Sequence, residues 1–313
     1  MTASISTAAT LSPLVNGYKV SVGPPKTIVV PKASQLVALQ EVTITGTLLK
    51  KQIETLDLST GKRTAHLAAN NGVYKPTPGD GDLHFCLGTT QLKPHIACEL
   101  QNAKAFVSLF NQAVGTKISV TGFFRCLFEH PGFKQNDDAH CFEIHPVRAV
   151  TLNGQVQTFD VDVPDQNAIH SWLVPHDLKV QDKKIKVKFD KTKDTLTFTG
   201  MDGQDENYVH ISGAISKIKL SASAGTLSSF TLDSAAIGKP ITVVCMQGTT
   251  ASTQLKALKS AGATKIEMVG LRNIDLQEAL KGNYAINLLG INIKDASGML
   301  AALSLDQPKA WLT

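Results

Sequence analysis

Hydrophobic and polar positions alternate strictly in two short runs of the chain, residues 82–87 and 141–147. Such alternation is typical of a half-buried β-strand, in which successive side chains point to opposite faces. We therefore expect the apolar side chains of both runs to face a core and the polar ones to face away from it. The polar positions with acid or imidazole groups are Asp82, His84, Glu143 and His145.

Residues 35–155 contain further runs of this kind and one helical segment. At residues 102–113 the apolar side chains fall on one helix face, and Gly115 ends the segment. The expected order is three strands, a helix and two strands, as in an OB-fold, a five-stranded Greek-key barrel. The predicted barrel strands are residues 42–49, 63–69, 82–87, 117–128 and 141–152, with residues 95–100 as an extra strand before the helix.

The same order of elements recurs within residues 206–300. Residues 118–122 correspond to residues 266–270, because each stretch follows a helix and a glycine, although the identity between them is slight. The predicted strands are residues 208–222, 226–232, 240–246, 265–270 and 284–289, and the predicted helix is 252–261. The expected fold class is mainly β, with tandem OB-type five-stranded Greek-key barrels, each with one helix between strands 3 and 4.

The rest of the chain falls into three smaller parts. Residues 1–34 are poor in charge and rich in Ser, Thr, Ala and Pro, which predicts an extended N-terminal arm. Residues 156–205 contain two alternating runs around a turn and predict a lysine-rich β-hairpin, either as an insertion or as part of a third small β unit. Residues 301–313 form a C-terminal tail, so the two barrels are expected at 35–155 and 206–300.

Positive charge is concentrated in the lysine-rich segment. The 313-residue chain has a net charge of +5 and a pI of about 8.8, which permits binding of a polyanion. Residues 179–193 hold seven lysines and two aspartates, a local balance of +5. These lysines either contact phosphates or protect an edge strand from aggregation. The candidate nucleic-acid-binding lysines are Lys183, Lys184, Lys186, Lys188, Lys191 and Lys193.

Aromatic residues make up only 6% of the chain, which limits the stacking that single-strand binders commonly use. Tyr74 and Phe128 lie in or near predicted loops and are candidate stacking residues. Strand alternation predicts that Phe123 is exposed. The rings predicted to face the core are Phe85, Phe124 and Phe142.

The acid and imidazole residues are the second candidate site. The third and fifth strands of an OB barrel are neighbours, so this assignment predicts Asp82 and His84 beside Glu143 and His145, with Glu99 on an adjoining segment. Such a cluster can bind Zn²⁺ or another divalent ion, provide an acid/base pair, or form a hydrogen-bonded network without chemistry. The sequence lacks a nucleophile elbow, an HExxH motif and a CxxC pair. No cofactor is expected, and a divalent metal is left open.

A family resemblance rests on four stretches: Gly81-Asp82-Leu83-His84, Ile96-Ala97-Cys98-Glu99-Leu100, Val120-Thr121-Gly122-Phe123-Phe124 and Glu143-Ile144-His145-Pro146-Val147. Together they resemble uncharacterised bacterial OB-like domains with a DGDxH…IAE…VTG…EIHP pattern. The resemblance covers residues 40–152 and implies an OB-like fold. It implies no activity, and it does not extend to residues 156–313.

Composition also bears on the compartment. The five cysteines are odd in number and include no CxxC, which is typical of free thiols in a reducing cytoplasm. No apolar run approaches the roughly 18 residues of a membrane-spanning helix. The N-terminal residues lack the basic and apolar regions of a secretory signal. We therefore expect a cytoplasmic protein without a membrane partner.

The leading hypothesis is a nucleic-acid-binding protein, single-stranded and sequence-tolerant in its preference, that acts through OB barrels and the lysine hairpin without catalysis. One alternative is an assembly protein that forms homo-oligomers through its N-terminal arm. Another is a metal-dependent phosphodiesterase that uses Asp82, His84, Glu143 and His145. OB barrels also bind sugars, proteins and small ligands, so the fold alone does not choose among these hypotheses.

Overall fold

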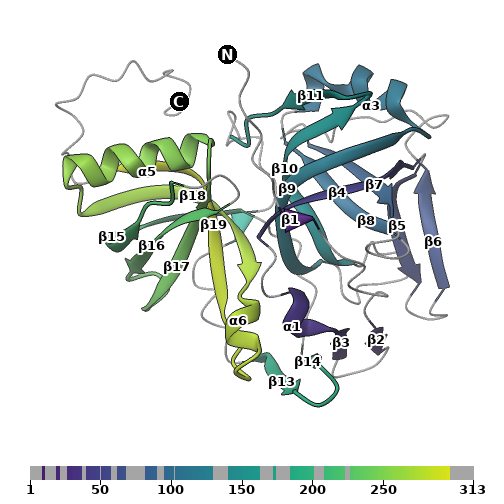
Figure 1. Ribbon diagram of the computed structural model, residues 1–313. Helices are drawn as coiled ribbons and strands as arrows, with labels where there is room; N and C mark the ends of the chain where they lie inside the picture. The colour runs from purple at the N-terminus through teal and green to yellow at the C-terminus, as the bar shows by residue number, and fades with distance from the viewer. Residues whose placement is uncertain are drawn as a thin grey trace.

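The computed structural model shows a mainly β protein in which two barrels lie side by side, with a small third sheet below them (Figure 1). The chain order runs from the barrel on the right of the view to the barrel on the left. The structure describes residues 9–10, 19–21, 27–36, 40–49, 51–57, 62–67, 82–89, 95–101, 103–129, 140–162, 172–173, 184–200, 208–222 and 226–296.

The first barrel closes through five strands. The hydrogen-bonded path runs β4–β7–β8–β10–β9 and returns to β4. The pair β8 and β10 is parallel and the other pairs are antiparallel. A 3₁₀ turn (Ala103–Ala105) and helix α3 (Val107–Ala113) connect β8 to β9, which is the OB arrangement. The strands are β4 (Glu41–Leu48), β7 (Leu83–Gly88), β8 (His95–Leu100), β9 (Lys117–Glu129) and β10 (His140–Leu152).

The second barrel repeats this topology. Its path runs β15–β16–β17–β19–β18 and back to β15, with β17 and β19 parallel. Helix α5 (Thr250–Ala261) lies between the third and fourth strands, and the short α6 (Leu276–Ala279) follows the fourth. The predicted fold class is therefore confirmed. The strands are β15 (Tyr208–Lys219), β16 (Leu227–Ser234), β17 (Lys239–Met246), β18 (Lys265–Ile274) and β19 (Ile286–Asp295).

The two barrels share a register as well as an order. In the first barrel Val42 pairs with Gly122 and Gly46 with Ile118. The equivalent pairs of the second barrel are Val209 with Gly270 and Gly213 with Ile266. Each first strand also receives a short parallel strand near its start, β1 (Ala9–Thr10) on β4 and β12 (Trp172–Leu173) on β15.

One part of the strand assignment was wrong. The predicted second strand, residues 63–69, lies outside the barrel: β6 (Lys62–Leu67) pairs with β5 (Lys51–Asp57) in a separate two-stranded hairpin. The barrel's second strand is β7 and its third strand is β8, so residues 95–100 are no extra element. The reason is that the end of β4 pairs directly with β7, Leu48 opposite Leu87, and the chain between them forms an excursion.

The third sheet joins the lysine hairpin to the N-terminal arm. Antiparallel β13 (Lys186–Asp190) and β14 (Thr195–Thr199) form the predicted hairpin. In addition, β14 pairs with β3 (Thr27–Pro31), which pairs with β2 (Lys19–Ser21). Helix α1 (Ala33–Leu36) follows β3, and Asp194 accepts hydrogen bonds from the backbone N–H and the hydroxyl of Ser34. The hairpin therefore belongs to a third small β unit.

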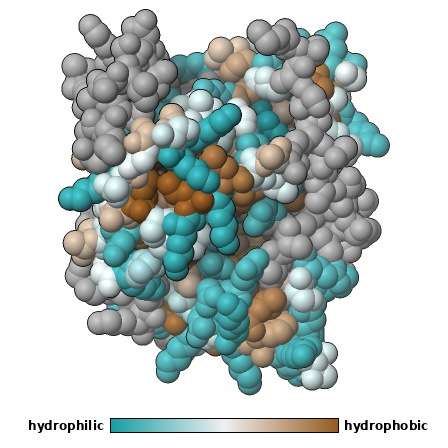
Figure 2. Space-filling model, turned by 60° about the vertical axis from the view of Figure 1, so that its left-hand side comes forward, coloured by the Kyte–Doolittle hydropathy of each residue, from teal (hydrophilic) through white to brown (hydrophobic). Residues whose placement is uncertain are grey.

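Three apolar clusters hold these units together. The first fills the first barrel and includes the inner face of the third sheet, and the second fills the second barrel. The third lies where the barrels meet and contains Phe123, Tyr208 and Leu271. The outer face on the second-barrel side is largely hydrophilic, with apolar areas near its centre and at its lower right in the view (Figure 2). Within the described residues, no helix is both long and apolar enough to cross a membrane.

The prediction that Phe123 is exposed was wrong, since only 3% of its surface remains accessible. Its side chain does point away from the core of the first barrel, as alternation requires. The second barrel covers it there. Phe85, Phe124 and Phe142 lie in the first core, as predicted.

Glycines in the first strands permit the close approach that closes each barrel. A Cβ atom at Gly46 would lie 2.3 Å from the carbonyl oxygen of Gly88, and one at Gly213 would lie 2.3 Å from that of Asp233. We expect Gly46→Ala and Gly213→Ala each to lower the free energy of unfolding by about 1–3 kcal/mol, the usual cost of overpacking. Urea unfolding measures this change. The exposed neighbour Ala214→Ser is the control, and an unchanged midpoint for both glycine variants would contradict the prediction.

Candidate functional site

The acid and imidazole residues come together on the outer face of the first barrel. Asp82 directly precedes β7, which carries His84, while Glu99 lies on β8 and Glu143 and His145 lie on β10. Their apolar neighbours in the same strands fill the core. Because β8 runs between β7 and β10, Glu99 is the central residue of the group.

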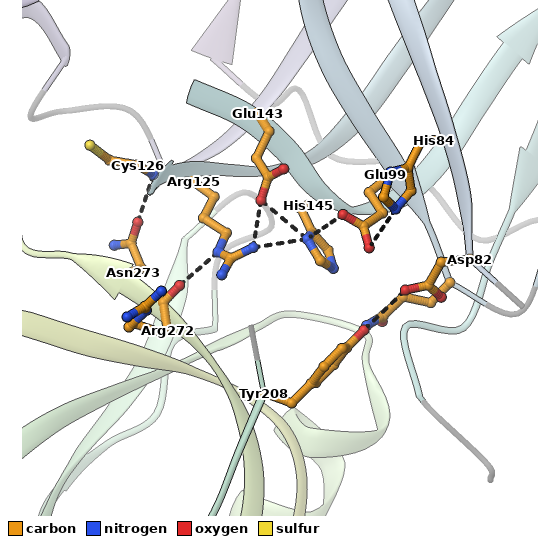
Figure 3. A network of polar contacts seen from close by, with 11 residues as sticks. Asp82, His84, Glu99, Arg125, Cys126, Glu143, His145, Tyr208, Arg272 and Asn273 are labelled. Atoms are coloured by element: carbon orange, nitrogen blue, oxygen red, sulfur yellow. Dashed lines mark hydrogen bonds and ion pairs between the residues drawn. The ribbon is translucent and has the colours of Figure 1, made fainter. Parts of the chain in front are cut away.

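A continuous polar network joins His84, Glu99, His145, Glu143 and Arg125 (Figure 3). One oxygen of Glu99, Oε1, lies 3.3 Å from Nε2 of His84, and the other, Oε2, lies 3.0 Å from Nδ1 of His145. Oε1 of Glu143 lies 3.1 Å from the same Nδ1 and accepts a 2.5 Å hydrogen bond from Nη1 of Arg125. We expected His84 and His145 to lie on neighbouring strands. Glu99 instead lies between them and contacts both, because β8 and not β7 is the third strand.

Two further hydrogen bonds connect Arg125 and its neighbour Cys126 to the second barrel. Nε of Arg125 donates to the backbone carbonyl of Arg272 at 2.6 Å, and the backbone N–H of Cys126 donates to Oδ1 of Asn273 at 2.8 Å. All four residues are buried. The network is therefore part of the contact between the barrels (Figure 3).

Tyr208, on the first strand of the second barrel, closes the other side of the network. Its hydroxyl donates to Oδ2 of Asp82 at 3.4 Å and accepts a short hydrogen bond from Nε2 of Gln101. Asp82 keeps 2% of its surface exposed and His145 none. A phosphodiester cannot reach these groups while the barrels stay in contact, so the arrangement disfavours the hydrolytic alternative.

Charge pairing sets the ionisation of the network. Burial lowers the pKa of His145, but the nearby charges of Glu99 and Glu143 outweigh burial and raise that pKa to about 9. Burial raises the pKa of Glu99, yet His145 and His84 outweigh it and hold that pKa well below its usual range. A carboxylate and an imidazolium therefore face each other inside the protein.

Free thiols lie close to this network and in the second core. Within the described part of the chain, the buried free cysteines are Cys86, Cys98, Cys126 and Cys245. Burial raises the pKa of Cys98 well above its usual value, and Cys86 and Glu143 add to this shift. Burial likewise raises the pKa of Cys245 to about 12. The thiols of Cys98 and Cys245 therefore remain protonated and behave as small apolar side chains.

The structure regroups the predicted metal residues. Asp82 and His145 belong, with Glu99, to a set whose ligand atoms all lie within 4.8 Å of one another. His84 instead contacts Glu99 from the more exposed side, and Glu143 is held by Arg125.

Sequence reasoning missed Arg125 and Tyr208 and left Glu99 on the margin. A signal existed for the first of these, because Arg125 is a lone charge inside the apolar run Gly122–Leu127. A charge in such a run is buried only when it is paired. No local pattern marks Tyr208, which reaches the network only through the contact between the barrels.

The predicted nucleic-acid-binding residues lie on the third sheet, apart from the acid and imidazole network. Lys186 and Lys188 are exposed on β13, and their register places them on the face shared with Thr197 and Thr199 of β14. Lys184, Lys191 and Lys193 flank this strand and are exposed too. Lys183 and Tyr74 lie outside the described residues. Phe128 lies in β9, but its side chain is not among those described.

Comparison with known proteins adds little to this description. No family model and no curated protein matches the chain. Among solved structures, the chain is similar to the wild-type single-stranded DNA binding protein from Thermus aquaticus. The identity is 10% over 83% of this chain and 93% of that chain, and the TM-score is 0.20. A superposition this loose equates no residues, so the fold assignment rests on the strand pairing itself.

We expect the buried guanidinium of Arg125 to contribute strongly to the stability of the protein. Arg125→Met removes the partner of Glu143 and leaves a carboxylate in the barrel contact, so we expect a loss of about 3–5 kcal/mol in unfolding free energy. Combining it with Glu143→Gln should recover part of this loss, because the unpaired charge disappears. Thermal and urea unfolding provide the measurements.

The matched control is Lys281→Met, which breaks an exposed ion pair of the same 2.5 Å length with Glu278. We expect it to leave the unfolding midpoint unchanged, because exposed pairs contribute little. An Arg125→Met variant as stable as this control would show that the network does not hold the barrels together.

Proposed function

We propose that this protein binds nucleic acid through the outer face of its third sheet, with a preference for single strands and little dependence on sequence. The observation that carries the proposal is the cluster of exposed lysines on β13 and the adjoining turn. Residues 184–194 contain five lysines and two aspartates, a local balance of +3.

These lysines are available for an external partner. In the part of the chain that the structure describes, their only ion pair joins Nζ of Lys193 to Oδ2 of Asp190, at 3.9 Å. Because Lys193 is 78% exposed, this pair is weak and is easily exchanged for a phosphate contact. Lysine provides a mobile point charge, which suits contact with a phosphate backbone better than recognition of bases.

The surface around the lysines supports the same function. Thr195, Thr197 and Thr199 share the face of Lys186 and Lys188 and are partly exposed, so their hydroxyls lie beside the positive charges. Hydroxyl and ammonium groups together donate hydrogen bonds to phosphate and sugar oxygens. The opposite face packs into the first core through Leu196 and Phe198, which makes the sheet a fixed platform.

The buried acid and imidazole network does not oppose this binding. Glu143 and Glu99 are covered and paired, so they present little negative charge to an approaching polyanion. Closed OB barrels commonly carry single-stranded nucleic acids, which agrees with the proposal by analogy of fold alone.

The oligomer alternative has less support. Strand β3 of the arm (Thr27–Pro31) pairs along its whole length with β14 of the same chain. Exchange of this strand with another subunit would replace this pairing and the core contacts of Ile28 and Val30 by identical ones, so it would add no contact.

Fluorescence anisotropy with labelled single-stranded and duplex oligonucleotides across a salt series tests the proposal. For single strands the logarithm of the affinity falls with the logarithm of salt by about 0.7 per phosphate contact. The double variant Lys186→Gln/Lys188→Gln should therefore reduce this slope by about 1.4 and weaken binding to all sequences alike.

The matched control is Lys256→Gln/Lys259→Gln, which removes the same charge from the exposed face of α5. We expect this control to leave the slope nearly unchanged. Absence of binding by the wild-type protein at low salt would refute nucleic-acid binding, and equal losses in both double variants would refute the assignment to the third sheet.

A further inference from the structure

A second candidate site lies inside the contact between the two barrels. Asp82, Glu99 and His145 each bring one ligand atom to within 4.8 Å of the others, and all three are buried. Their donor set is two carboxylates and one imidazole, which suits borderline first-row dications such as Zn²⁺ and Mn²⁺.

The second observation is an unpaired ring nitrogen. Nδ1 of His145 faces Glu99 and Glu143 and lies 3.0 Å from Nη1 of Arg125, but Nε2 is fully buried and has no hydrogen-bond partner among the described residues. In Figure 3 the ring lies between these two carboxylates and the side chains of Asp82 and Tyr208. A buried ring nitrogen without a partner is costly, and a metal ion would satisfy it.

We propose that Asp82, Glu99 and His145 form a divalent-cation site that stabilises the contact between the two barrels. His145 ligates through Nε2, whose proton the ion displaces, and its Nδ1–H donates to a carboxylate, the usual arrangement for a ligating histidine. This proposal is independent of nucleic-acid binding, which uses the third sheet.

The network contains one carboxylate more than the ring orientation requires. Both Glu99 and Glu143 accept from Nδ1, at 3.0 and 3.1 Å. Glu143 is fixed by Arg125, so it can orient the ring alone while Glu99 turns to the ion. Arg125 also compensates the charge of Glu143, and a divalent ion would compensate the two charges of Asp82 and Glu99.

The distances are close to those of a filled site. Zinc ligands lie about 2.0–2.2 Å from the ion, so two ligands of a tetrahedral site are about 3.4 Å apart. The separations within the described group, at most 4.8 Å, exceed this value by no more than about 1.4 Å. Tyr208 lies against Asp82 from the second barrel, so an ion held here would stabilise that contact too.

Calorimetric titration of the metal-stripped, full-length protein with ZnCl₂ and with MnCl₂ tests the site. We expect one ion per chain and a raised thermal midpoint in the loaded protein. His145→Asn keeps an amide N–H near Nδ1 and removes Nε2, and Asp82→Asn removes one carboxylate charge. Each should weaken the stoichiometric uptake by more than about 10- to 100-fold, the loss that removal of an outer-shell partner alone causes.

The matched control is His210→Asn, which removes an exposed histidine that contacts Glu267 at 2.6 Å. Uptake should be unchanged in this variant. Failure of the wild-type protein to take up either ion stoichiometrically, or uptake that survives both His145→Asn and Asp82→Asn, would overturn the proposal.

A measurement on the wild-type protein keeps the proposal testable if these variants fail to fold. Imidazole ¹H–¹⁵N spectra should show one histidine whose Nε2 resonance shifts on addition of the ion while its Nδ1–H signal persists. Imidazole resonances unchanged by the ion, or shifts confined to exposed rings, would refute ligation by His145.

Discussion

A guanidinium buried between two barrels is the interaction on which the rest of the structure depends. Arg125 has no exposed surface, and it joins Glu143 of its own barrel to a backbone carbonyl of the other. Removing such a charge from water is costly unless its partners stay in place. The relative position of the barrels and the charge state of the Glu143–His145 pair are therefore set together.

This contact decides where a ligand can bind. The outer face over the second and third strands is a common ligand face of OB barrels. Here those strands are β7 and β8. Asp82, just before β7, and Glu99 on β8 are both buried, and Asp82 accepts a hydrogen bond from Tyr208 of the second barrel. The first barrel thus uses much of this face for an internal contact, and the exposed positive charge lies instead on the third sheet, at Lys186 and Lys188.

The sequence predicted most of the fold, because alternation within a strand is a local property. It predicted both barrels, the helix between the third and fourth strands of each, and the lysine hairpin, but not the short helices α1 and α6. It misplaced the second and third strands of the first barrel, since β6 alternates as a barrel strand does but pairs only with β5. Which strands pair is decided over long separations, as when Leu48 meets Leu87, and no local pattern records that choice.

The candidate site depends even more on contacts that no local sequence pattern records. Alternation correctly placed His145 on the outer face of its strand, and only the second barrel converts that face into an interior. Once covered, carboxylates must be balanced by protons, cations or hydrogen bonds. Arg125 balances Glu143, so Asp82 and Glu99 depend on His145, its neighbours and, in our proposal, an ion. Most of the acid and imidazole residues that the sequence singled out as a candidate site are buried in the folded chain, and the contact between the barrels must neutralise their charges.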